Sequence, residues 1–334
     1  MENDHLKQTA KAMVVKTILA ADESSGTIKK RFATIGVESN PQINRQYRQL
    51  LFTAEGIEKY ISGVILYDET IRQTTDEGIP FPTLLTKKGI IPGIKVDQGT
   101  AKFKEDGVDT YTNGLDGLAE RFAEYKNLGA RFSKWRTVYT IADGSPTNEA
   151  VEKNAKDLAS YALVSQQASI TPIVEPEVLM DGDHRLEKCK EVTINVLTAV
   201  FAELKKQGVD FKGMILKPNM ITAGKNNSNQ APVETVAQET LKVLQTTVPQ
   251  EVPGIAFLSG GQSPDLATQH LNAMNKLRSA QETQYPWRLT ASYGRALQGE
   301  ALEAWAGQRD NVKTAQQVFL SRAAKVYKAS LGQL

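Results

Sequence analysis

The sequence predicts a single α/β domain with the fold of a parallel (β/α)8 TIM barrel. Eight short apolar or β-branched runs recur along the chain, and segments with helical spacing lie between most of them. Repeated alternation of strands and helices favours a closed parallel barrel, with a doubly wound open sheet as the alternative. The length of 334 residues also fits, because one such barrel typically takes about 250 residues and tolerates insertions. We therefore expect one domain over residues 1–334.

The expected elements follow one another in a regular order, beginning with a short N-terminal helix. The eight expected strands span residues 17–21, 63–67, 91–96, 130–136, 170–174, 213–217, 254–258 and 288–292. Five long helices are expected over residues 115–128, 148–167, 185–207, 233–248 and 265–280. Asn40-Pro41 and Ser263-Pro264 each join a capping residue to a proline at the first helical position, which is typical of a helix start. A mobile tail is expected over residues 323–334.

The bulk composition argues against several classes of function. Net charge is +2 and no long basic run is present, so we expect no nucleic-acid partner. No apolar stretch reaches the roughly 18 residues that span a bilayer, and residues 1–11 carry no signal-peptide core, so no membrane association is expected. Cys189 is the only cysteine and cannot form an intrachain disulfide, which fits a reducing, cytoplasmic location.

Lys217 is the most informative single residue. It closes the apolar run 213–216, and Pro218 follows it directly; the residue before a proline is driven towards extended backbone. Lys217 is therefore expected at the end of a buried strand, where its ammonium group is poorly solvated. Desolvation and nearby positive charge favour a neutral amine, which is a nucleophile. A strand-end lysine that only reaches solvent is the alternative interpretation.

Polar side chains gather at the C-terminal ends of the predicted strands, where enzymes of this fold carry their chemistry. Strand residues two apart point to the same side of a sheet, so same-side pairs are expected. These pairs are Lys95 with Asp97, Lys134 with Arg136, and Glu175 with Glu177. Any one pair alone is best explained as a structural ion pair. Seven strands that end in this way predict a site, because charges are buried only when they are paired or used.

Two groups of residues are candidate phosphate sites. They are Ser259, Gly260, Gly261, Ser292, Gly294 and Arg295 after the last two strands, and Ser24, Thr27, Arg31 and Lys95 after the first and third. Glycine lets backbone N–H groups approach an anion, and a helix start adds the positive end of a dipole. The loops after strands seven and eight of such barrels commonly bind phosphate. A ligand with a phosphate at each end would span the two groups.

An amine, carboxylic acids and phosphate-binding groups together predict Schiff-base chemistry on a phosphorylated carbonyl compound. The amine of Lys217 would attack a ketone, and the iminium formed by loss of water is an electron sink, so the bond beyond the adjacent carbon can break. Glu175 would donate and accept the proton of that dehydration. Like-charge repulsion from Lys95, Lys134 and Arg136 would favour the neutral amine of Lys217.

Seven stretches of the chain resemble the class I fructose-bisphosphate aldolase family. They are residues 18–24, 93–97, 130–136, 172–177, 216–219, 257–262 and 292–298. The resemblance covers nearly the whole chain and implies a (β/α)8 barrel without a metal or cofactor. It implies reversible cleavage of fructose 1,6-bisphosphate to dihydroxyacetone phosphate and glyceraldehyde 3-phosphate, with fructose 1-phosphate or a seven-carbon bisphosphate as alternative substrates. It also implies a homotetramer, with a dimer as the alternative, and cytoskeletal or adhesion partners.

The resemblance further implies a role for each candidate residue. Lys217 resembles the Schiff-base lysine, Glu175 the general acid/base, and Lys134 the cation that supports it. Asp22 resembles the residue that orients the ketose and assists proton removal at the C4 hydroxyl, and Glu177 completes the catalytic set. The C1-phosphate site would consist of Ser259, Gly260, Gly294 and Arg295, with Gly261 and Ser292 beside it. The C6-phosphate site would consist of Ser24, Thr27 and Lys95, with Arg31 and Arg136 close by.

The chain departs from the family in three places. It ends Gly332-Gln333-Leu334, whereas the common vertebrate form ends in a tyrosine that helps to protonate the enamine, and Tyr327 is the nearest tyrosine. Residues 14–17 replace the usual Pro-Gly-Lys-Gly, and Gln98 stands where a lysine is often found. The last two changes leave the proposed catalytic residues intact.

Two alternatives belong to other mechanisms or classes. A metal-dependent aldolase needs a ligand cluster, usually of histidines, and the three histidines His5, His184 and His270 show no paired spacing. A phosphosugar-binding or scaffolding protein without catalysis is the second alternative. Such a binder has no need of a lysine like Lys217 beside Glu175.

Overall fold

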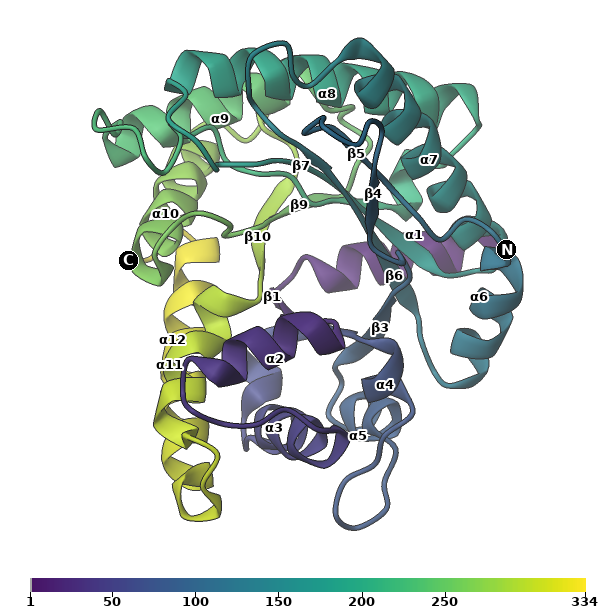
Figure 1. Ribbon diagram of the computed structural model, residues 1–334, viewed down its shortest axis with the longest axis vertical. Helices are drawn as coiled ribbons and strands as arrows, with labels where there is room; N and C mark the ends of the chain where they lie inside the picture. The colour runs from purple at the N-terminus through teal and green to yellow at the C-terminus, as the bar shows by residue number, and fades with distance from the viewer. Residues whose placement is uncertain (1) are drawn as a thin grey trace.

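The computed structural model describes residues 2–334, and its barrel confirms the predicted fold. Eight parallel strands close in the order β1-β10-β9-β8-β7-β6-β3-β2, with helices around them (Figure 1). The barrel strands are β1 (Thr17–Ala21), β2 (Ile61–Leu66), β3 (Ile91–Lys95), β6 (Phe132–Tyr139), β7 (Thr171–Val178), β8 (Ile215–Leu216), β9 (Gly254–Phe257) and β10 (Arg288–Tyr293). Each corresponds to a predicted strand, with ends shifted by a few residues.

The helices also follow the predicted pattern. They are α1 (Glu2–Met13), α2 (Ser25–Ala33), α3 (Pro41–Thr53), α4 (Asp68–Ile71), α5 (Phe81–Lys87), α6 (Leu118–Asn127), α7 (Asn148–Gln167), α8 (Leu186–Lys206), α9 (Val233–Thr247), α10 (Pro264–Ala280), α11 (Arg295–Trp305) and α12 (Val312–Ser330), with 3-10 turns η1 (Ile57–Lys59), η2 (Phe211–Gly213) and η3 (Arg309–Asn311). Asn40 and Ser263 cap α3 and α10 as predicted, because their side-chain oxygens accept hydrogen bonds from the third residue beyond. No helix in the described part of the chain has both the length and the apolar character needed to cross a membrane.

An apolar layer fills the inside of the barrel. It is formed by Ala10, Met13 and Val14 at the end of α1 and by Ile18, Ala20, Ile65, Phe132, Ile173, Ile215 and Ala256 from the strands. The Phe132 ring lies against Gly93, where an added Cβ would stand 2.3 Å from the ring, so only glycine fits. A larger apolar core lies between the strands and the surrounding helices. The N-terminal half of the barrel is thus packed solid, which leaves the other end for chemistry.

Two segments differ from the sequence-based expectations. A short antiparallel hairpin, β4 (Thr100–Lys102) with β5 (Thr110–Thr112), follows β3 and was not predicted. The segment expected to be a mobile tail is instead the last part of α12 as far as Ser330, with Ala323, Val326 and Ala329 buried. Alanine spacing gives too weak an apolar pattern to reveal that buried face.

Candidate active site

Four charged residues of the site lie just beyond the apolar layer, towards the C-terminal ends of the strands. Each follows an inward-facing apolar residue by two positions, and strand residues two apart face the same side. The steps are Ala20 to Asp22, Phe132 to Lys134, Ile173 to Glu175, and Ile215 to Lys217. Strand geometry therefore brings charged side chains from four different strands to the C-terminal end of one barrel.

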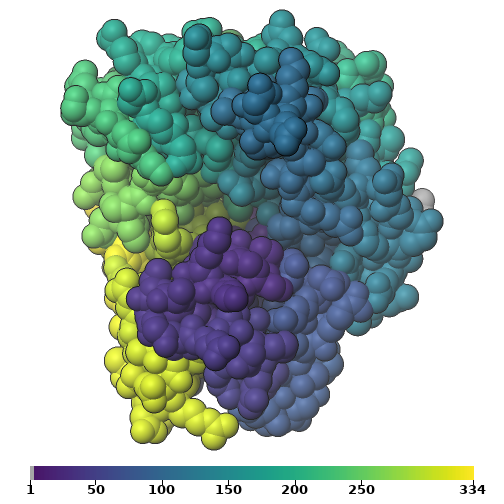
Figure 2. Space-filling model, viewed as in Figure 1, coloured from purple at the N-terminus to yellow at the C-terminus, as the bar shows by residue number. Residues whose placement is uncertain are grey.

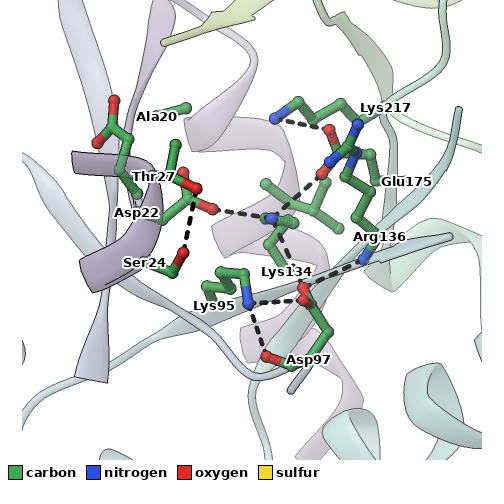
Figure 3. A network of polar contacts seen from close by, with 12 residues as sticks. Ala20, Asp22, Ser24, Thr27, Lys95, Asp97, Lys134, Arg136, Glu175 and Lys217 are labelled. Atoms are coloured by element: carbon green, nitrogen blue, oxygen red, sulfur yellow. Dashed lines mark hydrogen bonds and ion pairs between the residues drawn. The ribbon is translucent and has the colours of Figure 1, made fainter. Parts of the chain in front are cut away.

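These side chains form a chain of contacts, with Lys134 at its centre (Figure 3). Lys217 Nζ lies 3.1 Å from Glu175 Oε1, and Lys134 Nζ lies 3.4 Å from Glu175 Oε2. Lys134 Nζ also lies 2.8 Å from Asp22 Oδ2 and 3.7 Å from Asp97 Oδ2. One carboxylate thus connects the two lysines, and one lysine connects three carboxylates.

Lys95 completes this network from β3. Its Nζ lies 2.6 Å from Asp97 Oδ1, so its charge is paired rather than facing Lys217 alone. With three lysines and three carboxylates the cluster can balance its charge, which buried ionised groups require. Glu175 Oε2 is nevertheless buried without a hydrogen-bond partner among the described residues. Its nearest charged neighbour is the Lys134 ammonium, 3.4 Å away.

Asp22 and Lys134 hold each other ionised. Burial alone would raise the pKa of the Asp22 carboxyl, but Lys134, Lys217 and Lys95 outweigh it and hold that pKa well below its usual range. Burial alone would lower the pKa of Lys134, but Asp22, Glu175 and Asp97 together raise it above the usual range. Lys134 is therefore a fixed cation and not a nucleophile, which leaves Lys217 as the buried amine at the centre of the site.

Arg136 and Glu177 form a second ion pair beside this cluster. Arg136 Nε contacts Glu177 Oε2 across the β6–β7 register. Burial would lower the pKa of Arg136, but Glu177 and Glu175 more than compensate and raise it. Glu177 Oε1 would be 2.9 Å from a Cβ at Gly260, so a side chain there would displace the carboxylate. The pair lies beside the Gly260 loop. Because Arg136 neutralises Glu177, Glu177 does not act as a second free acid next to Glu175.

The cluster opens into a cavity of about 1490 Å³. Figure 2 shows the hollow above the purple segment that contains α2. Every predicted site residue except Gly261 lines it. Gly261 has a φ of +73° and turns towards Met180, where an added Cβ would lie 2.8 Å from the side chain. Its place in the substrate-binding set stays a prediction; the residue itself shapes the loop that presents Gly260.

Two helix starts face the cavity from neighbouring strands. The N-terminus of α2 brings Ser24 and Thr27, whose hydroxyl oxygens are 3.1 Å apart, and the N-terminus of α11 follows Gly294. Neither helix has an acidic residue in its first turn, so the positive ends of both dipoles are uncompensated. With Lys95 and Arg295 also lining the cavity, these starts favour an anion at each side.

Several residues of the site were missed from sequence. Asp97 was noted only as the partner of Lys95, yet it also faces Lys134. Arg48 and Gln298 reach Glu23, a residue of the cavity wall, from distant parts of the chain, and no local pattern signals such contacts. Asp97 could have been found, since it shares a strand side with Lys95.

Tyr327 is placed away from the cavity. Its ring packs against Tyr60, with ring centroids 6.1 Å apart, just before β2 begins and therefore at the opposite end of the barrel. The main chain of Leu334 is hydrogen-bonded to Asn272 and Lys276 on α10. Tyr327 is thus no substitute for a tyrosine that reaches the site.

The fold and site define a class of protein. A buried amine next to a carboxylic acid, at the strand ends where (β/α)8 enzymes react their substrates, is typical of lysine-dependent catalysis on a carbonyl group. The two helix starts without acidic residues favour a negatively charged ligand. Among the described residues, no group of three or more His, Cys, Asp or Glu side chains is arranged to hold a metal ion.

Comparisons with known proteins give the family. A family model described as "Fructose-bisphosphate aldolase class-I" matches residues 5–334. A cytoplasmic isozyme of fructose-bisphosphate aldolase from Spinacia oleracea is 49% identical over 95% of this chain and 88% of its own length. A probable class 1 fructose-bisphosphate aldolase from Xanthomonas axonopodis pv. citri is 46% identical over 100% of this chain and 99% of its own.

A solved structure agrees with these relatives. Fructose-bisphosphate aldolase from Plasmodium falciparum, in complex with TRAP and a small-molecule inhibitor, superimposes with a TM-score of 0.96 at 45% identity, over 99% of this chain and 95% of that one. The chain belongs to the class I fructose-bisphosphate aldolase family, whose members are metal-independent lyases of the Schiff-base type. Family membership supports a glycolytic role and does not favour the non-catalytic alternative.

Proposed function

We propose that the chain cleaves fructose 1,6-bisphosphate reversibly into dihydroxyacetone phosphate and glyceraldehyde 3-phosphate through an imine on Lys217. The observation that carries this proposal is the 3.1 Å contact between Lys217 Nζ and Glu175 Oε1, with both side chains about 5% exposed or less. An amine attacks a ketone only when neutral, and Glu175 is within reach of its proton. Glu175 and Lys217 both line the cavity, so a ligand bound there would meet this pair.

The first half of the reaction forms the imine. Lys217 Nζ attacks C2 of the ketose, and the carbonyl oxygen takes up a proton to give a carbinolamine. Glu175 then donates a proton to the departing hydroxyl, water leaves, and a protonated imine remains. The protonated imine carries one positive charge, and the Glu175 carboxylate, ionised again once it has donated its proton, balances it.

The second half breaks the carbon–carbon bond. We assign Asp22, which Lys134 holds ionised, as the base that takes the proton from the C4 hydroxyl. The electron pair of the C3–C4 bond moves into the iminium and leaves an enamine, while C4 departs as the aldehyde of glyceraldehyde 3-phosphate. Protonation of the enamine at C3 and hydrolysis of the imine then release dihydroxyacetone phosphate and restore the Lys217 amine.

The two phosphates give the substrate its orientation. We assign the C1 phosphate to the side of Ser259, Gly260 and the start of α11, with Ser292 and Arg295 beside it. We assign the C6 phosphate to Ser24, Thr27 and Lys95. The support is that these groups line one cavity and that each side includes a helix start free of acidic residues. A bisphosphate uses both sides, which favours it over fructose 1-phosphate.

Lys217→Ala tests the proposal. We expect cleavage to be abolished, while binding of fructose 1,6-bisphosphate, measured by calorimetry, persists through the phosphate contacts. Lys225→Ala is the matched control, because Lys225 pairs with Asp181 at the surface and lies outside the cavity. Cleavage by Lys217→Ala at the rate of the control would contradict the mechanism.

The setting of the activity is also proposed. We infer a cytoplasmic enzyme, because the relatives from Spinacia oleracea and Arabidopsis thaliana are named cytoplasmic and cytosolic aldolases. A homotetramer, with a dimer as the alternative, is proposed from family resemblance and is tested by sedimentation equilibrium of the purified chain. Cytoskeletal or adhesion partners stay a proposal on the same ground.

A further inference from the structure

A buried carboxylate at the wall of the cavity is shared by two arginines. Glu23 follows β1, and its Oε2 accepts a hydrogen bond from Arg48 Nη2 at 2.7 Å. Its Oε1 contacts Arg31 Nη1 and accepts a second bond, at 3.2 Å, from Gln298 Nε2. We call these four residues the Glu23 cluster. Arg48 is 2% exposed and does not line the cavity, whereas Arg31 does.

The cluster has a net charge of +1, because the single carboxylate of Glu23 faces the two guanidinium groups of Arg31 and Arg48. Over residues 4–334, Glu23 is the only carboxylate that pairs with Arg48 or with Arg31. A buried excess charge is unfavourable unless another group compensates it. Because Arg48 is sealed away from the cavity, the compensating anion must approach Arg31. Glu23 and Arg48 therefore leave Arg31 fixed in direction yet only half neutralised.

The cluster also joins the two sides of the proposed substrate site. Gln298 lies on the first turn of α11 after Gly294, and its Nε2 donates to the carbonyl oxygen of Ala20 at 2.6 Å as well as to Glu23. Arg31 lies on α2, and its Nη2 would be 3.6 Å from a Cβ on Gly294. The same hydrogen bonds thus hold α2 and α11, which carry the two helix starts, in one fixed arrangement.

We propose that Arg48 is a positioning residue for substrate phosphate: through Glu23 it holds the Arg31 guanidinium at the cavity between the two proposed phosphate sites. This inference rests on the proposed function and adds a residue that never touches the substrate. Without Arg48, the Glu23 carboxylate is free to turn, and Arg31 can fold back onto it fully and neutralise it. The phosphate then loses an oriented cation while Lys217 and Glu175 are untouched.

The test is a double-mutant cycle between Arg48→Met and Arg31→Met. Arg48→Met should raise KM for fructose 1,6-bisphosphate about tenfold, the size of one charge-assisted hydrogen bond, with kcat within about twofold of the starting protein. The effect of Arg48→Met on KM should vanish in the Arg31→Met background, because the arginine acts through its neighbour. An equal KM effect in both backgrounds, or a loss confined to kcat, would overturn the proposal.

Two further variants protect the test from loss of folding. Gln298→Met releases the same carboxylate without removing a charge, and its rise in KM should likewise disappear once Arg31 is replaced. Arg322→Gln is the control, because Arg322 is also buried and holds Glu300 and Asp265, but away from the cavity. It should leave KM unchanged, and a tenfold rise there would assign the Arg48 effect to general destabilisation.

Binding of inorganic phosphate separates this inference from the proposed function. If the unmodified protein does not cleave the sugar bisphosphate, the proposed function fails. Phosphate affinity measured by calorimetry still tests whether Arg48 positions Arg31. We expect Arg48→Met to weaken phosphate binding about tenfold and Arg322→Gln to leave it unchanged. Equal phosphate affinity in all three proteins would refute the role of Arg48 even if cleavage proceeds.

Discussion

Replacing Lys134 with methionine removes the central cation of the site and keeps most of its stem. Lys134 is 4% exposed and contacts Asp22, Glu175 and Asp97 at 2.8, 3.4 and 3.7 Å. Removing one partner of a buried ion pair costs roughly 3–5 kcal/mol of unfolding free energy, because the remaining charges are left uncompensated. We expect Lys134→Met to lose about that amount at neutral pH and most of its activity.

The pH dependence of that loss has a defined sign. In the parent protein the pKa of Asp22 is held below its ordinary value of 3.8, so its stabilising contribution is complete above that pH and is lost only as pH falls below it. Lys134 lowers the pKa of Asp22 both by its charge and by a hydrogen bond, so without it we expect burial to outweigh Lys217 and Lys95 and to raise that pKa above the ordinary value. A folded state that takes up a proton gains stability as pH falls, by up to about 1.4 kcal/mol per unit.

Urea unfolding at about pH 8 and about pH 5 measures both effects. The stability gap between Lys134→Met and the parent should narrow at the lower pH. Lys190→Met is the control, because Lys190 pairs with Glu239 at 2.5 Å while 36% exposed, and such pairs contribute roughly 0–1 kcal/mol. A Lys134→Met protein as stable as that control, or a gap that widens in acid, would refute the account of this cluster.

Three further predictions concern packing, proton transfer and metals. Gly93→Ala should destabilise the fold by roughly 1–3 kcal/mol in thermal or urea unfolding, since its Cβ would overlap the Phe132 ring, and Phe132→Leu should recover part of the loss; an unchanged melting temperature would contradict this packing. Glu175→Gln should lower kcat roughly 10²–10⁴-fold in steady-state assays, and a loss smaller than about tenfold would remove Glu175 from the proton transfers. Prolonged treatment with excess chelator should leave kcat/KM unchanged, and loss that added zinc restores would point to a metal-dependent mechanism.

The sequence predicted the barrel well because strand periodicity is local information. Each strand is marked by a short apolar run. Residues two apart in a strand face the same side, so Lys134 follows Phe132, and Lys217 follows Ile215, on the inward face of the barrel. That is why the lysines and acids at the strand ends could be named before their distances were known.

The failures have equally physical causes. The β4–β5 hairpin was missed because each strand has only three residues and only Thr112 is buried, so no apolar face marks it. The helical end of α12 was not predicted because its buried face is largely alanine. The Glu23 cluster joins residues up to 275 positions apart, and only the folded chain brings them together. That Gly261 lies outside the cavity lining could not be foreseen, because sequence does not say which way a turn points.

Reductive trapping on Lys217 tests the central claim most directly. Borohydride is added to the protein with fructose 1,6-bisphosphate and chelator present, and the digested peptides are analysed by mass spectrometry. We expect a substrate-derived secondary amine on the peptide that contains Lys217, and none in the Lys217→Ala protein. An adduct on Lys134 instead, or turnover without any adduct, would contradict it.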